Sequence, residues 1–287
     1  MGKIAVALEQ ALTRRRLQGE AGRVTHRAVA GGTGWAVADG LCTSGPQDRP
    51  DEERHTHYSI AMVVAGTFQY RTALGAGLMA PGSVMLGNPG LPYECGHEHA
   101  EGDRCVVFWF EPEYFEELTG ARFRVARVPP LRDLAPLVVS AGAGAVGARD
   151  IAWEELAVTV AVRTAGLAAG PAAHQDALPL NAGARVTRAI RAIDALPDAN
   201  HGLVTLARES RLSAYHFLRT FERLTGVTPH QYVLRARLRS AATQLVTESR
   251  KVIDVALNTG FGDVSNFNRA FRGEFGMSPR AYRQHSR

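Results

Sequence analysis

The chain has 287 residues, 45% of them hydrophobic and 21% charged, which is typical of a globular protein long enough for two domains. Its net charge of +5 is unevenly distributed. Residues 183–287 contain 17 lysines and arginines against 8 acidic residues, so this segment carries +9 and the remainder −4. A basic segment joined to an acidic one is typical of a nucleic-acid-binding module and argues against a helical domain whose arginines are merely solvated.

Two further classes of protein are excluded by local composition. Cys42, Cys95 and Cys105 are odd in number and irregular in spacing, which argues against a secreted disulfide framework. No apolar run approaches the roughly 20 residues that a membrane helix needs. Glu9 and the arginines at 14–16 interrupt the first twenty residues, which predict a short amphipathic helix and not a signal peptide. We therefore expect a cytoplasmic protein without a membrane partner.

Residues 34–110 show short β-type runs separated by glycine and proline. The runs at 58–64 and 66–71 predict two strands across a turn, and those at 78–80 and 83–86 flank Pro81-Gly82. Residues 105–110 are apolar throughout, as in a strand that is buried on both faces. Many short strands at this spacing predict a barrel or jelly roll.

A cluster of cysteines and histidines precedes the last of these strands. If residues 95–99 are extended, Cys95, His97 and His99 point to one face, and a hairpin over 100–104 would set His99 opposite Cys105. Such a cluster can bind a zinc-like ion, and its cysteines can respond to oxidants. A structural role, or a place in the wall of an organic-ligand pocket, accounts for the same residues. The identity of any cofactor stays open at this point.

From Glu111 onward the pattern becomes helical. Helices are predicted at 112–118 and 131–140, then a flexible break at 141–147, then a longer helix at 150–167. Ile151, Leu156, Val158 and Val162 are available for one face of this last helix. Residues 168–184 are rich in alanine, glycine and proline and are predicted to be a linker before a helix at 185–196.

The C-terminal segment contains an internal duplication. Seven residues recur fifty positions later with one hydroxyl residue exchanged for another: Phe217, Arg219, Phe221, Gly226, Thr228, Pro229 and Tyr232, then Phe267, Arg269, Phe271, Gly276, Ser278, Pro279 and Tyr282. Leu206-Ala207 and Val255-Ala256 also correspond, with one extra residue in the second turn. A repeat of this kind indicates a duplicated structural unit.

Each copy predicts a helix, a tight turn and a second helix. Ser213 and Asp263 are placed to cap the second helices, and Thr228-Pro229 and Ser278-Pro279 begin further helices. The phenylalanines of each copy recur at nearly helical spacing and must face inward, so the opposite faces are free for DNA. Arginine and asparagine there fit base edges, and other arginines fit phosphates. The predicted DNA-binding residues are Ser213, Tyr215, His216, Leu218, Arg219, Arg223, Ser265, Asn266, Asn268, Arg269 and Arg272.

The duplicated segment resembles the C-terminal domain of the AraC/XylS family of bacterial transcription regulators. The second copy carries the resemblance from Gly260-Phe261 through Asp263, Phe267-x-Arg269-x-Phe271 and Gly276-x-Ser278-Pro279 to Tyr282. The resemblance implies two helix-turn-helix units, here 203–226 and 252–276, joined by a long helix at about 229–246. It also implies that their recognition helices enter successive major-groove segments on one face of double-stranded DNA.

The N-terminal half resembles a cupin, the usual sensor domain of that family, through His55-Thr56-His57, Gly66 and Pro81-Gly82. The glutamate expected soon after the histidines is replaced by residues 60–62, and the histidine expected after Pro-Gly is missing. A cupin dioxygenase site is therefore incomplete. An organic effector in the barrel would lie near His55, His57 and Met85. The helices after the barrel either cover it or form a dimer interface, as they usually do in the family.

Together these patterns predict an α+β chain with a cupin-like barrel and helical extension at 1–167, a linker at 168–184 and an all-α double helix-turn-helix domain at 185–287. The predicted function is an effector-responsive transcription regulator that acts as a homodimer, and, if an activator, contacts RNA polymerase. The alternative is a metal-dependent cupin enzyme with a DNA-binding tail. No nucleophile–base pair is recognisable, so we do not expect an enzyme.

Overall fold

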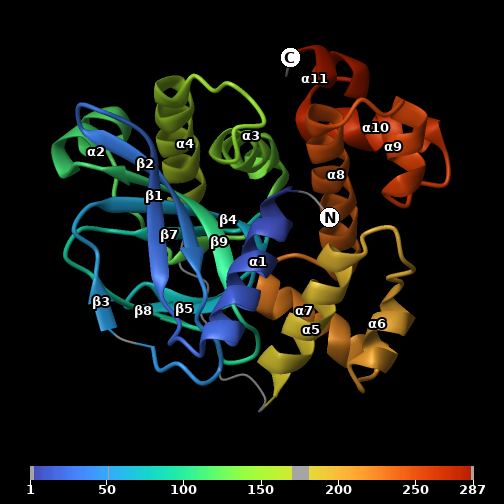
Figure 1. Cartoon of the computed structure of the whole chain (residues 1–287), viewed down its shortest axis with the longest axis horizontal. Coiled ribbons are helices and arrows are strands. Elements are labelled where there is room, and N and C mark those ends of the chain that lie inside the picture. The colour runs from blue at the N-terminus through green and yellow to red at the C-terminus, as the bar shows by residue number, and fades with distance from the viewer. Residues whose placement is uncertain (1–2, 51, 170–180, 286–287) are drawn as a thin grey trace.

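The computed structural model describes residues 3–50, 52–169 and 181–285. Strands fill the N-terminal half and helices the C-terminal half, so the predicted α+β organisation in two parts is confirmed (Figure 1). Within the described residues no helix is both long and apolar enough to cross a membrane. Residues 170–180, the central part of the predicted linker, lie outside the described residues.

The strands form two antiparallel sheets. The first has six strands in the order β1-β2-β9-β4-β7-β10, and the second has four in the order β3-β8-β5-β6. Their bounds are β1 Val24–Gly32, β2 Trp35–Cys42, β3 Glu52–Arg54, β4 Tyr58–Gly66, β5 Phe68–Thr72, β6 Gly75–Met79, β7 Val84–Gly87, β8 Pro92–Gly96, β9 Asp103–Phe110 and β10 Arg127–Val128.

Alternation along β9 explains how the layers pack. Val106, Phe108 and Phe110 join a core against the helices on one face of the six-stranded sheet. Cys105 and Val107 face the other way, into a core shared with the four-stranded sheet. Because successive strand residues point to opposite faces, an apolar run of this kind fits a strand covered on both sides, as predicted.

Two strand pairings differ from the sequence prediction. β4 and β5 follow each other across Gly66 but belong to different sheets, and β8 pairs with β3 and β5, so β8 and β9 form no hairpin. Gly66 has φ +76°, and a side chain there would meet the carbonyl oxygen of Gly102. Hydrogen bonding among the described strands gives two open sheets, so the closed cupin-like barrel is not confirmed.

Helices cover the outer face of the six-stranded sheet. Their bounds are α1 Lys3–Gln18, α2 Pro112–Thr119, a 3-10 turn Arg132–Leu134, α3 Ala135–Ala145 and α4 Trp153–Ala168. The flexible break predicted at 141–147 is wrong in its first part, because α3 continues to Ala145. The small residues of this stretch are buried, and a side chain at Gly144 would meet Trp153. α4 buries Ala157, Val160 and Ala161, whereas Val162 is 48% exposed, so its predicted apolar face is only partly right.

Seven helices complete the described chain. They are α5 Ala182–Ala195, α6 Leu203–Glu209, α7 Ala214–Thr225, α8 Pro229–Thr247, α9 Val252–Asn258, α10 Val264–Phe275 and α11 Pro279–His285. α8 is the long connecting helix predicted at 229–246. The α6–α7 unit lies near one end of α8 and the α9–α10 unit near the other (Figure 1).

The two halves share hydrophobic cores. Leu78 and Ala80 join the core formed by α5, α6, α7 and α8, while Ala135 and Val139 of α3 join that of α9 and α10. Arg127 of β10 donates hydrogen bonds to the carbonyl oxygens of Leu224 (2.9 Å) and Thr225 (3.1 Å) at the end of α7. Burial lowers the pKa of Arg127 to about 10. The C-terminal helices are therefore held against the sheets by both apolar and polar contacts.

Candidate nucleic-acid interface

The α6–α7 unit folds around residues that the duplication marks as internal. Leu206, Phe217 and Phe221 are fully buried, and the chain turns between the helices at Arg211, which adopts a left-handed φ of +53°. The hydroxyl of Ser213 accepts a hydrogen bond from the backbone N–H of His216 at 3.3 Å, which confirms the predicted cap. The buried side chains thus fix one face of α7 and leave the other in solvent.

The α9–α10 unit repeats this arrangement with different turn chemistry. Val255, Phe267 and Phe271 are fully buried, and the turn is made at Gly260 with φ +85°. The carboxylate of Asp263 accepts a hydrogen bond from the backbone N–H of Asn266 at 2.7 Å, again as predicted. Gly226 and Gly276 end the two second helices with φ values of +79° and +75°.

Helix α8 fixes the second unit relative to the rest of the bundle. It begins with a capping box in which Thr228 and Gln231 satisfy each other's backbone N–H groups. Arg237 of α8 donates hydrogen bonds to the carbonyl oxygens of Pro197, Ala199 and Gly260, at 2.8 to 3.1 Å. One arginine thereby connects the turn of the second unit to the loop after α5.

Nearly all of the predicted DNA-binding residues lie on the solvent-exposed faces of α7 and α10 or at their N-terminal caps. Leu218 is partly buried, and the others are exposed: Ser213, Tyr215, His216, Arg219, Arg223, Ser265, Asn266, Asn268, Arg269 and Arg272. On each helix the side chains opposite the phenylalanines combine cationic and hydrogen-bonding groups. This arrangement can contact both phosphates and base edges.

A cleft beside α10 adds two arginines, Arg132 and Arg280, to those predicted from the sequence. It has a volume of about 870 Å³ and is lined in part by Arg132, Arg269, Arg272 and Arg280. Arg132 comes from the 3-10 turn before α3, in the N-terminal half. Its approach to α10 depends on packing between distant segments, so the local sequence gave no signal for it. The grouped guanidinium groups suit a phosphate backbone.

The C-terminal segment matches known proteins in the same region. A family model described as a helix-turn-helix domain matches residues 206–285. The regulatory protein SoxS of Salmonella typhimurium is 33% identical over 91 residues, which are 32% of this chain and 85% of SoxS.

The chain belongs to the AraC/XylS family of transcription regulators.

Other family members match a smaller share of their length. The transcriptional activator RhaS of Klebsiella pneumoniae is 39% identical over 79 residues, 28% of each chain. The chain spans only 28% to 31% of the length of several curated relatives that it matches. Among solved structures, the DNA-binding domain of AdpA in complex with a target DNA is 29% identical, with a TM-score of 0.35. That match covers 35% of this chain and 91% of the AdpA domain.

The predicted metal ligands of this AraC-family chain do not all come together. His97 is buried, and its Nε2 lies 2.8 Å from Oδ1 of Asp103. The thiol of Cys105 donates to the other oxygen of Asp103 at 3.3 Å. Cys95 is part of strand β8, and His99 lies beside Glu98, 3.7 Å away. Cys42, in contrast, lies close to His97 and Asp103. Because Cys42 is distant from both in the sequence, it was not among the predicted ligands.

The protonation of this cluster follows from its burial and its charges. Burial acts to lower the pKa of His97, but Asp103 and Cys42 together raise it to about 10, so the imidazole is charged beside the carboxylate. Burial, reinforced by the charge of Asp103, raises the pKa of the thiols of Cys95 and Cys105 well above the usual range. Reactive thiols have lowered pKa values, so these environments give no support to the redox hypothesis.

The residues predicted to bind an organic effector are also dispersed. His55 is buried and stacks on Tyr93 with 4.0 Å between ring centroids, and its Nε2 lies 2.9 Å from the Tyr70 hydroxyl. Met85 is buried in the core between the sheets. His57 is turned toward Glu111, whose carboxylate is 3.3 Å from its Nε2. His55 and Met85 thus serve packing between the sheets, and His57 lies apart from them.

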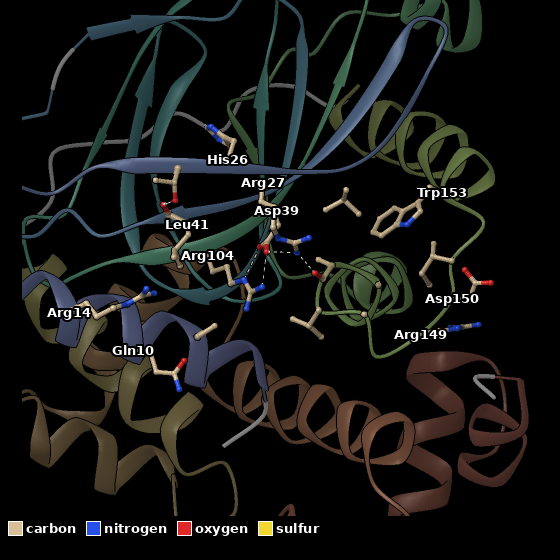
Figure 2. Close-up of a pocket in the computed structure, with 18 residues that line it drawn as sticks. Gln10, Arg14, His26, Arg27, Asp39, Leu41, Arg104, Arg149, Asp150 and Trp153 are labelled. Carbon is tan, nitrogen blue, oxygen red and sulfur yellow. Dashed lines mark hydrogen bonds and ion pairs between the residues drawn. The ribbon is translucent and has the colours of Figure 1, made fainter.

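A cavity of about 880 Å³ lies beside the edge of the six-stranded sheet instead. Figure 2 shows Asp39 between Arg27 and Arg104, with Gln10 and Arg14 of α1 on one side and Asp150 and Trp153 on the other. Arg104 binds both oxygens of Asp39 at 2.8 Å, and Arg27 adds a bond of 2.9 Å. Burial acts to raise the pKa of Asp39, but the two arginines lower it below its usual value. The triad carries a net positive charge at the cavity wall.

Proposed function

We propose that this chain is a sequence-specific DNA-binding transcription regulator whose N-terminal half responds to an effector. The observation that carries the proposal is the repeated polar face, exposed once on α7 and once on α10. α7 and α10 would enter successive major-groove segments of one DNA duplex, with Arg269 and Asn268 reading base edges. Arg132 and Arg280 would contact phosphates beside the second segment.

The N-terminal half is proposed to be a cupin-like sensor that takes its effector in the cavity of Figure 2. The Arg27–Asp39–Arg104 triad favours a molecule with a carboxylate or other anionic group, and Trp153 provides an aromatic surface. We further propose a homodimer formed through α4, on which Val162 is 48% exposed. As an activator, the DNA-bound dimer would recruit RNA polymerase.

Binding of the full chain to DNA tests this function. A binding site is first selected from random duplexes, and its affinity is then measured by fluorescence anisotropy over a range of salt concentrations. We expect log K to fall with log salt by about 0.9 for each phosphate contacted, with preference for the selected site retained. Equal affinity for selected and scrambled duplexes at every salt concentration would contradict sequence-specific regulation.

The sensing half has a separate test. Organic acids are screened by their effect on thermal unfolding, since a ligand that binds only the folded state raises Tm. Substituting Arg27→Met should abolish the shift caused by any such ligand, because Arg27 is 60% exposed and faces the cavity. A matched change outside the cavity, Arg71→Met, should leave the shift unchanged. If Arg27→Met leaves the shift intact, the effector binds elsewhere.

A further inference from the structure

Three potential metal ligands meet where β2 ends and β9 begins. The strand register sets Cys42 directly opposite Asp103, and His97 reaches the same point from the crossover between β8 and β9. The Sγ of Cys42, a ring nitrogen of His97 and a carboxylate oxygen of Asp103 all lie within 4.8 Å of one another. The three residues are only 5% to 7% exposed.

The donor types match one class of ion. Thiolate, imidazole and carboxylate together are ligands of zinc, which accepts sulfur, nitrogen and oxygen in tetrahedral sites. Calcium and magnesium take oxygen ligands and would be poorly served by Cys42 and His97. Of the four ligands predicted from the local sequence, only His97 is retained: Cys42 and Asp103 join it, and Cys95, His99 and Cys105 are not part of the set.

Neighbouring groups orient two of the three ligands. The backbone N–H of Ser44 lies 3.4 Å from Sγ of Cys42, where it can donate to a thiolate. The thiol of Cys105 donates to Oδ2 of Asp103 at 3.3 Å, which directs Oδ1 toward His97. Outer contacts of this kind commonly fix the geometry of metal ligands.

We propose that Cys42, His97 and Asp103 form a site for a zinc-class divalent cation. Binding would replace the hydrogen bond between His97 and Asp103, and protons from His97 and Cys42 would leave to solvent. The ion would connect the crossover at 97–102 to the six-stranded sheet. The site shares no residue with the effector cavity, although Leu41 and Arg104 of that cavity are the neighbours of Cys42 and Asp103 along β2 and β9.

Cobalt(II) and zinc binding by the purified full-length chain tests this proposal. After treatment with a chelator, the chain is titrated with cobalt(II), and its absorption spectrum is recorded. We expect one equivalent to bind, with a thiolate-to-cobalt charge-transfer band and the intense visible bands of tetrahedral coordination, both displaced by zinc. Failure to bind either ion, or an octahedral spectrum without charge transfer, would overturn the site.

Variants identify the ligands. Cys42→Ser should remove the charge-transfer band, and His97→Gln should weaken zinc by more than the roughly 10–100-fold that loss of an outer partner costs. Cys95→Ser and His99→Gln are matched controls that should retain binding. If either control loses the ion as fully as Cys42→Ser, the ligand set is wrong.

X-ray absorption on the unmodified chain loaded with zinc does not depend on how the variants fold. It should detect one sulfur at about 2.3 Å together with nitrogen and oxygen neighbours at about 2.0–2.2 Å. A first shell containing only nitrogen and oxygen would exclude Cys42 and overturn the proposed ligand set.

Discussion

The two helix-turn-helix units are nearly the same inside and different outside. Phe217 and Phe221 of the first correspond to Phe267 and Phe271 of the second, and all four are fully buried. On the exposed faces, His216, Leu218 and Glu222 of α7 correspond to Asn266, Asn268 and Arg272 of α10. Packing therefore preserves the scaffold, whereas the surface of each copy is free to meet a different partner.

We infer from this difference that the two units make different kinds of contact with DNA. The asparagines of α10 carry amide groups that can bind adenine edges, and its arginines lie in a cationic cleft. α7 instead exposes Tyr215 and part of Leu218, whose apolar surfaces suit thymine methyl groups. We infer that the second unit supplies more of the hydrogen-bonded readout, and the first unit more of the apolar contact.

The largest loss of stability is expected from substitutions in the buried interiors of the two units, which contain corresponding residues. Phe221→Ala and Phe271→Ala should each lower the free energy of unfolding by about 3–5 kcal/mol, because each removes a fully buried ring. Urea unfolding of the full chain measures this loss. Tyr215→Ala, which changes a side chain that is 65% exposed, should cost no more than about 0.5 kcal/mol. A small loss for only one phenylalanine would show that the two interiors are not equivalent.

The two turns should differ in how far substitution destabilises the protein. Gly260→Ala places a methyl group 2.8 Å from Cα of Asp198 at a left-handed φ, so strain and contact together should cost at least about 2 kcal/mol. Arg211→Gly relieves the strain of a left-handed φ at the equivalent turn, but it also raises the conformational entropy of the unfolded chain. These two effects on the free energy of unfolding should nearly cancel. Thermal unfolding compares the two variants. Equal destabilisation by both would contradict the assigned role of φ.

Substitutions on the exposed faces of α7 and α10 should change how the protein discriminates between DNA sequences. Arg219→Ala and Arg269→Ala should each lose about 1–3 kcal/mol of discrimination between the selected site and its single-base variants. The affected base pairs should be about one helical turn apart, because the units lie at opposite ends of α8 (Figure 1). Arg250→Ala, which removes a charge outside both helices, should weaken all sequences alike. If Arg219→Ala and Arg269→Ala also weaken all sequences alike, these faces do not read bases.

The caps should show the smallest difference. Ser213→Ala and Asp263→Ala should each cost about 1 kcal/mol of stability, since each removes an acceptor for a free N–H group. Asp263→Ala should lower the stability by more than Ser213→Ala at low salt, because the negative charge of Asp263 also interacts favourably with the positive end of the α10 dipole. Unfolding in low and high salt separates these contributions. A salt-independent difference would mean that charge plays no part.

Local features were predictable from the sequence, and long-range pairings were not. Ser213 and Asp263 cap helices as expected because a cap depends on residues three positions away. Which sheet a strand joins depends on partners that are distant in the sequence. The prediction that β4 and β5 pair across their turn is therefore wrong. Alternation identified β9 as buried on both faces, but it could not say which strands lie beside it.

The candidate sites divide in the same way. The exposed faces of α7 and α10 follow from the spacing of their phenylalanines, so their residues could be named in advance. Cys42 and Asp103 are sixty-one positions apart in the sequence and meet only through strand register. Arg132 likewise reaches the cleft beside α10 through packing between the two halves. No local pattern could have included either residue.

The contact between Arg127 and the end of α7 limits how this chain can exchange parts with its relatives. Recombination in the segment between α4 and α5 would place α7 against the sheet of another protein. Without the counterpart of Arg127, the carbonyl oxygens of Leu224 and Thr225 would lose their guanidinium donor. The same exchange would uncover the apolar surface that Leu78 and Ala80 now occupy. A transplanted sensor would therefore need a compatible β6 and β10. We therefore expect the two halves to be inherited together, because the surfaces through which they contact each other must match.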